Sequence, residues 1–336
     1  MKLLFELSKE HKMLPSDEVC ATLEVEDHRY TIVDSNDDVL VVEITSDDSV
    51  IQRLAERLAY TFMIDELVFS CPATLSDMVR SAEKHPLFAE GSIAIRCKNR
   101  STSIQSDEVI DRLGAVYTKD RMVNLGHPDI ELRAVVTEDR AYVGIKKAAL
   151  DTSPFHQRRG HFRPFLLPIT LHPKIARGLV NLSSVKRHET LLDPFCGTGG
   201  ILLEAGLLGI HVIGSDVEEK MIEGCRKNLE FFHLQDFSLF CADIGDVSKH
   251  VPVVDAVVTD FPYARATTTK GEQLTHLYTR AFQNISQLLK KNGRAVIGLS
   301  SKDILTIGEK YLSVVETYPI VSHRSLTRYF VVYTKT

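Results

Sequence analysis

Cysteine pairs and long apolar runs are both missing from this 336-residue sequence, and each absence excludes a class of protein. The six cysteines form no Cys-x-x-Cys pair, so neither a zinc ribbon nor a disulfide framework is indicated. The longest apolar runs, such as 253–258, fall far short of the ~18 residues that a membrane span needs. The first residues meet an acid too early for a signal peptide. We therefore expect a cytoplasmic protein with reduced thiols and no membrane segment.

The sequence also lacks a spacing typical of metal ligands, because its histidines are scattered singly along the chain. Hydrophobic residues make up 44% and charged residues 25%, which is ordinary for a globular protein and argues against disorder. The length favours two or three domains. We expect no metal and a monomer.

The net charge of −5 is unevenly distributed. Residues 1–50 hold 4 basic and 13 acidic side chains, whereas 51–165 hold 17 and 15, and 166–336 hold 19 and 17. The first fifty residues would repel a polyanion, and the remainder would tolerate one. A basic cluster follows residue 145, and a solvated loop is the alternative to a phosphate-binding role. Its cations are Lys146, Lys147, Arg158, Arg159 and Arg163.

The two halves of the chain have different patterns. The first predicts an α+β fold, with helices over 51–63 and 107–113, the second ended by Gly114. A proline-rich stretch at 148–173 fits no regular element and predicts a linker. From residue 173 onward, helices alternate with short apolar strands, which predicts a doubly wound α/β sheet. Ligands of such sheets bind beyond the carboxyl ends of the strands.

The first candidate site is 193–200, which follows a strand and opens a helix. Its glycines allow the backbone to approach a ligand closely, but Asp193 would repel a pyrophosphate and attract a cation. Asp216 ends the next strand, where a carboxylate can accept two ribose hydroxyls. S-adenosylmethionine carries an ammonium, a sulfonium and a ribose but no phosphate, and therefore suits these acids. A purely structural turn is the alternative.

Two further acids follow the next strands of the same half. Asp243 can accept the amino group of an adenine while Ile244 packs on the ring, although a surface turn would also explain this acid. Asp260 opens the segment Asp260-Phe261-Pro262-Tyr263. Its carboxylate and the Phe261 carbonyl can both accept hydrogen bonds from an exocyclic amine, which frees the nitrogen lone pair. Pro262 holds Phe261 extended, and Tyr263 can stack on the base.

These motifs resemble the amino-methyltransferases with a Rossmann-fold domain, which carry an Asp-Pro-Pro-Tyr-like motif. The segments 163–165, 173–182 and 323–328, and a THUMP-like stretch around 94–98 and 123–129, extend the likeness. The whole chain is similar to the archaeal tRNA (guanosine-10 N2) methyltransferase family. This resemblance implies a C-terminal Rossmann-like class I methyltransferase domain, with a mostly parallel sheet and an antiparallel last strand, behind N-terminal α+β ferredoxin-like and THUMP domains.

The resemblance also implies boundaries and roles. The expected parts are a ferredoxin-like domain (1–50), a THUMP RNA-binding domain (51–147), a linker (148–168) and the methyltransferase domain (169–336). S-adenosylmethionine would be the methyl donor and N2 of a tRNA guanosine the acceptor, receiving one methyl or two. The expected donor-binding residues are Asp193, Phe195, Gly197, Thr198, Gly199, Asp216, Val217, Asp243 and Ile244. The expected catalytic residues are Asp260, Phe261, Pro262 and Tyr263, and Arg324 and Arg328 join the cations expected at RNA.

The motif departs from the usual family pattern at two places. Phe261 stands where the family has a proline, and Ala264 stands where it has a glycine. Both changes bear on the geometry of the loop and on the second methylation. Three alternatives stay open: the same chemistry on another tRNA position or on rRNA, N6 methylation of DNA adenine, and a catalytically silent tRNA-binding module.

Overall fold

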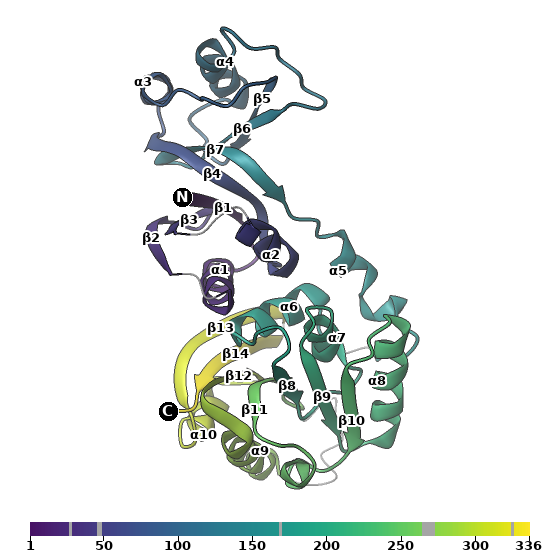
Figure 1. Ribbon diagram of the computed structural model, residues 1–336. Coiled ribbons are helices and arrows are strands. Elements are labelled where there is room, and N and C mark those ends of the chain that lie inside the picture. Colours follow the sequence, from purple (N-terminus) through teal and green to yellow (C-terminus); the bar gives the residue numbers. More distant parts are fainter. Residues whose placement is uncertain (27–28, 46–48, 168–169, 264–272, 324–325) are drawn as a thin grey trace. The chain divides into compact units, whose positions relative to one another are not determined.

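The computed structural model describes residues 1–336 except 27–28, 46–48, 168–169, 264–272 and 324–325 (Figure 1). Two compact units are present. The N-terminal unit comprises residues 1–16, 27–56 and 60–151, and the C-terminal unit comprises 17–26, 57–59 and 152–336. No helix in the described part of the chain is both long enough and apolar enough to cross a membrane.

One sheet of seven strands organises the N-terminal unit, in the order β2-β3-β1-β4-β7-β6-β5. Only β5 and β6 pair in parallel, and the other neighbours are antiparallel. The central strand β4 pairs with β1 on one side and with β7 on the other, so the sheet is continuous. The strands are β1 (Lys2–Leu7), β2 (Tyr30–Ser35), β3 (Val39–Ile44), β4 (Thr61–Pro72), β5 (Ile93–Asn99), β6 (Ile130–Val136) and β7 (Arg140–Ala149).

The helices of the first half differ from expectation in length. The helix expected over 51–63 is α2 (Ser49–Arg57), because the β-branched and aromatic run that follows enters β4 instead. The helix expected to end at Gly114 is α4 (Ser106–Tyr117), which continues because its last turn buries Tyr117. Helices α1 (Leu14–Val25) and α3 (Leu75–Lys84) were not expected.

The second sheet also has seven strands, in the order β10-β9-β8-β11-β12-β14-β13. Strands β8 to β12 run in parallel, and β14 pairs antiparallel with both β12 and β13. This confirms the expected fold class. The strands are β8 (Thr190–Asp193), β9 (His211–Asp216), β10 (Phe237–Cys241), β11 (Val254–Asp260), β12 (Leu289–Leu299), β13 (Ser313–His323) and β14 (Leu326–Thr334).

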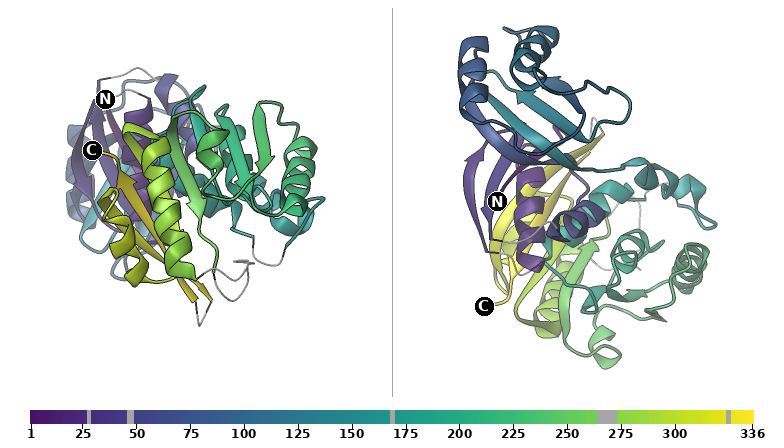
Figure 2. Two further views of the ribbon diagram at one scale, coloured as in Figure 1. Left: turned by 90° about the horizontal axis from the view of Figure 1, so that it is seen from below. Right: turned by 45° about the horizontal axis from the view of Figure 1, so that its top comes forward.

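Helices lie on both faces of this sheet (Figure 2). The helices from residue 152 onward are α5 (Ser153–Gln157), α6 (Pro173–Leu182), α7 (Gly200–Gly206), α8 (Glu219–Phe231), α9 (Leu274–Leu288) and α10 (Leu305–Gly308). The stretch expected to lack regular structure therefore contains α5 and a short 3₁₀ turn at Gly160–Phe162. Helix α9 stops at Leu288, and the chain passes directly into β12.

Part of the N-terminal sequence belongs to the C-terminal unit. The Glu18 carboxylate on α1 is fully buried and accepts hydrogen bonds from Asn181 Nδ2 of α6, at 2.7 Å, and from the Ala59 amide, at 3.0 Å. Tyr318 on β13 donates to Asp17 at 2.8 Å. These buried contacts make residues 17–26 and 57–59 structural parts of the C-terminal unit.

Candidate functional site

Acids end three of the parallel strands in the C-terminal unit. Asp193 is the last residue of β8, Asp216 of β9 and Asp260 of β11, while Asp243 follows the end of β10. Parallel strands bring their carboxyl ends to one edge of a sheet, so these side chains face the same region. The negative charges of Asp260 and Asp216 both act on Asp193, as expected for groups that share a site.

A glycine turn joins β8 to α7. Gly197 and Gly199 have φ of 48° and 79°, a region that favours glycine. A Cβ on Gly199 would lie 2.5 Å from Cys225 Sγ, whereas one on Gly197 would meet nothing within 4 Å. The Gly197 amide donates to Asp216 at 3.1 Å. The turn is therefore packed on one side and open at Gly197, as a ligand cradle requires.

Asn228 of α8 holds this turn in place from below. Its fully buried side chain donates to the carbonyls of Thr198 and Phe165, each at 2.9 Å, and accepts from the Phe165 amide at 2.9 Å. The segment before α6 is thereby fixed to the glycine turn. Sequence analysis missed Asn228, since a single asparagine within an amphipathic helix carries no signal of its own.

Asp193 is a buried acid whose carboxyl is strongly perturbed. Burial raises the pKa of its carboxyl to about 7, and the charges of Asp260 and Asp216 add to that rise. Burial also raises the pKa of Asp216, although the backbone amides of Gly197 and Glu218 oppose the change. A cluster of buried carboxylates favours a cationic ligand, because a positive charge offsets both burial and mutual repulsion. The residues present thus fit a sulfonium donor with an ammonium group.

Two side chains engage the Asp260 carboxylate. Tyr263 donates its hydroxyl to Oδ1, and Arg328 of β14 places Nη1 3.1 Å from Oδ2. The Arg328 guanidinium also lies over the Tyr263 ring, 5.1 Å from its centroid. Burial raises the pKa of Asp260, while the Arg328 charge and the Tyr263 hydrogen bond lower it.

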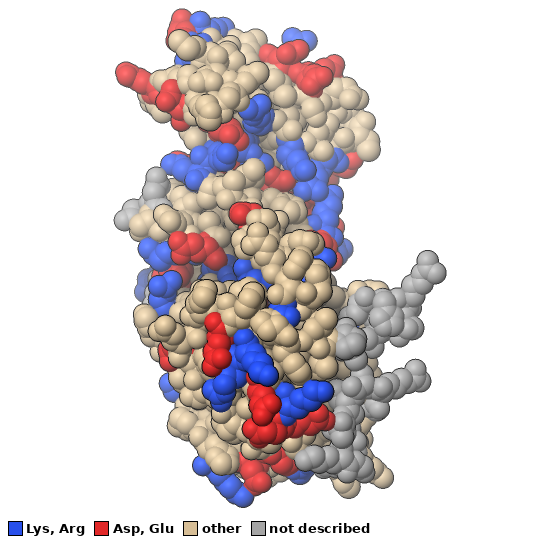
Figure 3. All heavy atoms as spheres, turned by 90° about the vertical axis from the view of Figure 1, so that its right-hand side faces the viewer, with Lys and Arg blue, Asp and Glu red and all other residues tan. Residues whose placement is uncertain are grey.

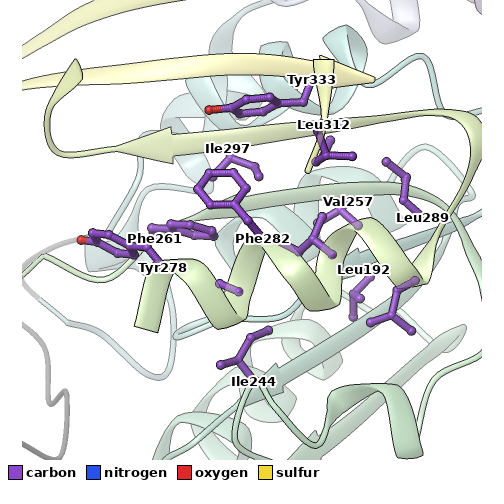
Figure 4. Packing of buried hydrophobic residues seen from close by; sticks show 14 of the residues in the cluster. Leu192, Ile244, Val257, Phe261, Tyr278, Phe282, Leu289, Ile297, Leu312 and Tyr333 are labelled. Atoms are coloured by element: carbon purple, nitrogen blue, oxygen red, sulfur yellow. The ribbon is translucent and has the colours of Figure 1, made fainter. Parts of the chain in front are cut away.

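Phe261 anchors the segment that follows Asp260. Its side chain is 1% exposed and stacks on Tyr278 at 5.4 Å between ring centroids, with edge contacts to Phe195 at 5.3 Å and Phe282 at 5.2 Å (Figure 4). The Tyr278 hydroxyl donates to the Pro262 carbonyl at 2.8 Å. The constraint lost with the family's proline is therefore replaced by aromatic packing from α9.

Asp243 has a partner that the sequence did not reveal. Arg280 on α9 forms an ion pair with its carboxylate, and the Gly245 amide donates to the same group at 2.8 Å. Ile244 is 3% exposed and belongs to the hydrophobic core beside α9. The expected contacts of Asp243 and Ile244 with an adenine stay predictions.

The lysines expected at RNA have partners within the N-terminal unit. Lys146 lies 3.0 Å from Glu131, and Lys147 lies 2.8 Å from Glu66. Figure 3 shows the same tendency over one face, where Lys and Arg lie in small groups next to Asp and Glu. The two lysines can reach a phosphate only by competing with these carboxylates.

The arginines of the expected linker are engaged inside the C-terminal unit. Arg158 binds the fully buried Glu204 at 2.6 Å, and Arg177 binds the same carboxylate at 3.0 Å. Arg163 is buried and donates Nε to the Arg158 carbonyl at 2.8 Å, and Arg159 donates to a histidine ring. Contacts of these side chains with RNA stay predictions, and Arg324 lies outside the described residues.

Two family models match the chain. An RMKL-like methyltransferase domain model matches residues 160–309, and a THUMP domain model matches residues 73–146. The structure of TrmN from Thermus thermophilus resembles the chain with a TM-score of 0.56 and 19% identity, covering 99% of this chain and 100% of that one. The class is therefore that of methyltransferases with a THUMP domain and a Rossmann-like catalytic fold.

Relatives of known name narrow the class further. The tRNA (guanine(10)-N2)-dimethyltransferase of Methanothermobacter thermautotrophicus is 33% identical over 98% of both chains. The enzyme of the same name from Methanocaldococcus jannaschii is 30% identical, again over 98% of each chain. The chain belongs to the tRNA (guanine(10)-N2)-dimethyltransferase family, which confirms the resemblance inferred from its motifs. A tRNA (guanine(6)-N2)-methyltransferase of Archaeoglobus fulgidus is 27% identical over 58% of this chain.

Proposed function

We propose that this protein methylates the exocyclic N2 of a tRNA guanosine at position 10, to the mono- and then the dimethyl stage. The relatives that match the full chain carry that activity in their names. The observation that carries the proposal is the placement of Asp260, which ends β11 on the edge where Asp193 ends β8 and Asp216 ends β9. A hydrogen-bond acceptor for the target amine and a site for the cationic methyl donor thus lie at the same edge of the sheet.

S-adenosylmethionine is the methyl donor, and when bound it supplies an electrophilic methyl group on a sulfonium. Asp193 would hold its ammonium, because that carboxylate is buried among like charges. Asp216 would accept the ribose hydroxyls, since among the described residues its two oxygens accept from the backbone amides of Gly197 and Glu218 and keep spare lone pairs. The glycine turn would pack against the part of the donor that lies between its ammonium and its ribose. The remaining proposed contacts are Phe195, Thr198, Val217, Asp243 and Ile244.

The acceptor side depends on Asp260 and its loop. The Asp260 carboxylate and the Phe261 carbonyl accept hydrogen bonds from the two N–H groups of the guanine amine, which leaves its lone pair available. Tyr263 supplies a stacking surface for a base that has left its helix. The Tyr263 hydroxyl donates a hydrogen bond to Asp260 Oδ1. When the base enters, its amine must displace that hydroxyl in order to donate to the same oxygen.

The remaining assignments are also proposals. We assign RNA binding to a THUMP domain at 51–147 behind a ferredoxin-like domain at 1–50, with a linker at 148–168 and the methyltransferase domain at 169–336. The tRNA phosphates would contact the cations of the basic cluster, which are Lys146, Lys147, Arg158, Arg159 and Arg163. We expect a cytoplasmic monomer that needs no metal.

The decisive experiment follows the modified nucleoside. Purified protein is incubated with unmodified tRNA and tritium-labelled S-adenosylmethionine, and the nucleosides are then identified by mass spectrometry. N2-methylguanosine and N2,N2-dimethylguanosine at position 10 support the proposal. Label at another guanosine or at an adenine would replace the proposed site, and donor binding without transfer to any RNA would favour a silent module.

The RNA-binding assignment needs point variants rather than a deletion. Removing residues 1–145 would also remove α1 and the 57–59 segment, whose buried bonds to Asn181 belong to the C-terminal unit. A double variant, Lys146→Gln with Lys147→Gln, tests the assignment with the fold intact. We expect weaker tRNA binding in a filter assay and an unchanged donor affinity. Unchanged RNA affinity would indicate that these lysines pair with their glutamate partners and do not bind RNA.

A further inference from the structure

Arg328 is the basic side chain closest to the proposed reaction centre among the described residues, and the pairing of the strands determines its position. It lies on β14, which pairs with β12 so that Gly298 stands opposite Phe330. Gly298 is in turn the register partner of Asp260 on β11. Two strand pairings therefore bring β14 to the end of β11. Arg328 is only 6% exposed there.

The room for this contact comes from a glycine. A Cβ at Gly298 would lie 2.3 Å from Asp260 Oδ1 and 2.8 Å from the Phe330 ring. Any side chain there would displace the carboxylate. Gly298 thus lets the Asp260 carboxylate lie across β12 towards Arg328 on the next strand.

The contacts of Arg328 differ from those of a cation that waits for phosphate. One nitrogen binds Asp260 at 3.1 Å, and the guanidinium plane lies against the Tyr263 ring. Its buried Nε finds no hydrogen-bond partner among the described residues. A buried guanidinium that meets both a carboxylate and an aromatic face fixes two groups at once, which a lysine could not do.

We propose that Arg328 is a positioning residue for methyl transfer, whose guanidinium orients the Asp260 carboxylate towards the target amine and supports the Tyr263 ring under the base. The inference rests on the proposed function, because it assigns a role in that reaction. It replaces the RNA contact that the sequence analysis expected for Arg328.

Charge at Asp260 depends on neighbours from four elements. Arg328 comes from β14, Asp193 from β8, Tyr278 from α9, and Tyr263 from the loop after β11. Arg328 is the one positive charge in this set, and it favours the ionised carboxylate. Removing it leaves only the Tyr263 hydrogen bond to oppose the effect of burial on the Asp260 pKa, so Asp260 should take up a proton at a higher pH.

The test compares Arg328→Gln and Arg328→Lys with the unaltered enzyme in steady-state assays on tRNA from pH 5 to pH 9. For Arg328→Gln we expect kcat to fall about 10- to 100-fold, because the carboxylate is misplaced. We also expect the acidic limb of the profile to move to higher pH, with the KM for tRNA nearly unchanged. Arg328→Lys keeps the charge and should keep the limb in place with an intermediate kcat.

Three results would overturn the proposal. A raised KM for tRNA with normal kcat would indicate a phosphate contact. A uniform loss of kcat with the limb unmoved would indicate a structural role only. Unchanged kinetics would remove any role. Arg328→Met is the second uncharged variant if Arg328→Gln fails to fold, and donor affinity by calorimetry checks each protein.

A matched control separates this role from general loss of a cation. Arg226 on α8 also lies over an aromatic ring, Phe237, at 5.9 Å, and is exposed. Arg226→Gln should leave kcat and the pH profile unchanged. Failure of the proposed function is distinguishable, since the unaltered enzyme would then show no transfer to tRNA and no variant comparison would be possible.

Discussion

Each unit of this protein buries a group of acids, and the two groups are balanced differently. In the N-terminal unit, Arg133 on β6 lies between two carboxylates, binding Glu6 of β1 and, at 2.7 Å, Asp65 of β4. Arg100 approaches Glu6 from the other side, at 3.4 Å. Every acid of this group faces a guanidinium.

The three acids at the strand ends of the C-terminal unit share one cation instead. Among the described residues, Asp193, Asp216 and Asp260 have a single ion-pair partner, Arg328, which binds Asp260. Burial raises the pKa of Asp193 to about 7, and the charges of Asp260 and Asp216 add to the rise. Burial also raises the pKa of Asp65 in the other unit, to about 6, but there the Arg133 guanidinium opposes the rise. The acids around Arg133, each paired with a guanidinium, stabilise a sheet, whereas the strand-end acids, which have one cation among them, can bind a cationic ligand.

The largest effect should follow from Asp260→Asn. An amide at this position cannot provide the negative charge that favours the developing cation on the target nitrogen, so we expect methyl transfer to fall about 10³- to 10⁴-fold. Donor affinity should stay within a few-fold, because Asp193 and Asp216 remain. Tritium transfer to unmodified tRNA and calorimetry with the donor measure the two quantities. Retained turnover would end the assignment of Asp260 to the reaction.

The opposite result is expected for Arg133→Met. Removing one partner from a buried ion pair leaves charges uncompensated and destabilises the fold by about 3–5 kcal/mol. Because the lesion lies in the N-terminal unit, the intrinsic donor affinity of folded protein should not change. Urea unfolding followed by circular dichroism gives the first quantity and calorimetry the second. A loss of donor affinity in the folded variant would break the distinction between the two groups.

The edge with the acids could be predicted from the sequence because each acid follows a short apolar strand. Alternation of strands and helices implies a parallel sheet, and a parallel sheet implies one common edge. The partners of those acids could not be predicted. Arg328 reaches Asp260 only through the register of β14 on β12, and Arg280 reaches Asp243 from α9. Register across a sheet is a tertiary property.

Helix α1 shows a second limit of sequence reasoning. It was not expected because it is buried on nearly every side and contains buried polar groups, Glu18 and Thr22, which disturb the apolar spacing. The buried Glu18 carboxylate accepts a hydrogen bond from Asn181, which follows much later in the chain, so its role could not be seen from the local sequence. Pro154 in the expected linker was similarly misleading, since it lies in the first turn of α5.

Asp193→Asn should stabilise the free protein while impairing its ligand binding. The folded carboxyl has a pKa of about 7 against an ordinary 3.8, so the folded state holds a proton that the unfolded chain has released. Stability of the unaltered protein therefore falls as pH rises from about 4 to about 7. Asparagine removes this loss, and we expect a gain of roughly 2–3 kcal/mol at pH 7.5.

Two measurements check the change at Asp193. Urea unfolding should show the gain at pH 7.5 and a much smaller one at pH 4.5, where Asp193 is protonated in the folded protein. Calorimetry at pH 7.5 should show donor affinity reduced about 100-fold, in keeping with the loss of a buried charge pair. An equal gain from Asp193→Asn at both pH values would show that the acids of this edge are no less balanced than those around Arg133.

The smallest effects concern Tyr263, and they separate its ring from its hydroxyl. Tyr263→Ala removes the stacking surface, which should cost about 1–3 kcal/mol in tRNA recognition. Tyr263→Phe keeps the ring and frees Asp260 Oδ1, so the base no longer has to displace the hydroxyl. Transfer by the phenylalanine variant should therefore equal or exceed that of the unaltered enzyme at low tRNA concentration. If Tyr263→Phe instead lost as much activity as Tyr263→Ala, the hydroxyl would itself take part in the reaction, and Arg328 would no longer be the one group that prepares Asp260 for the amine.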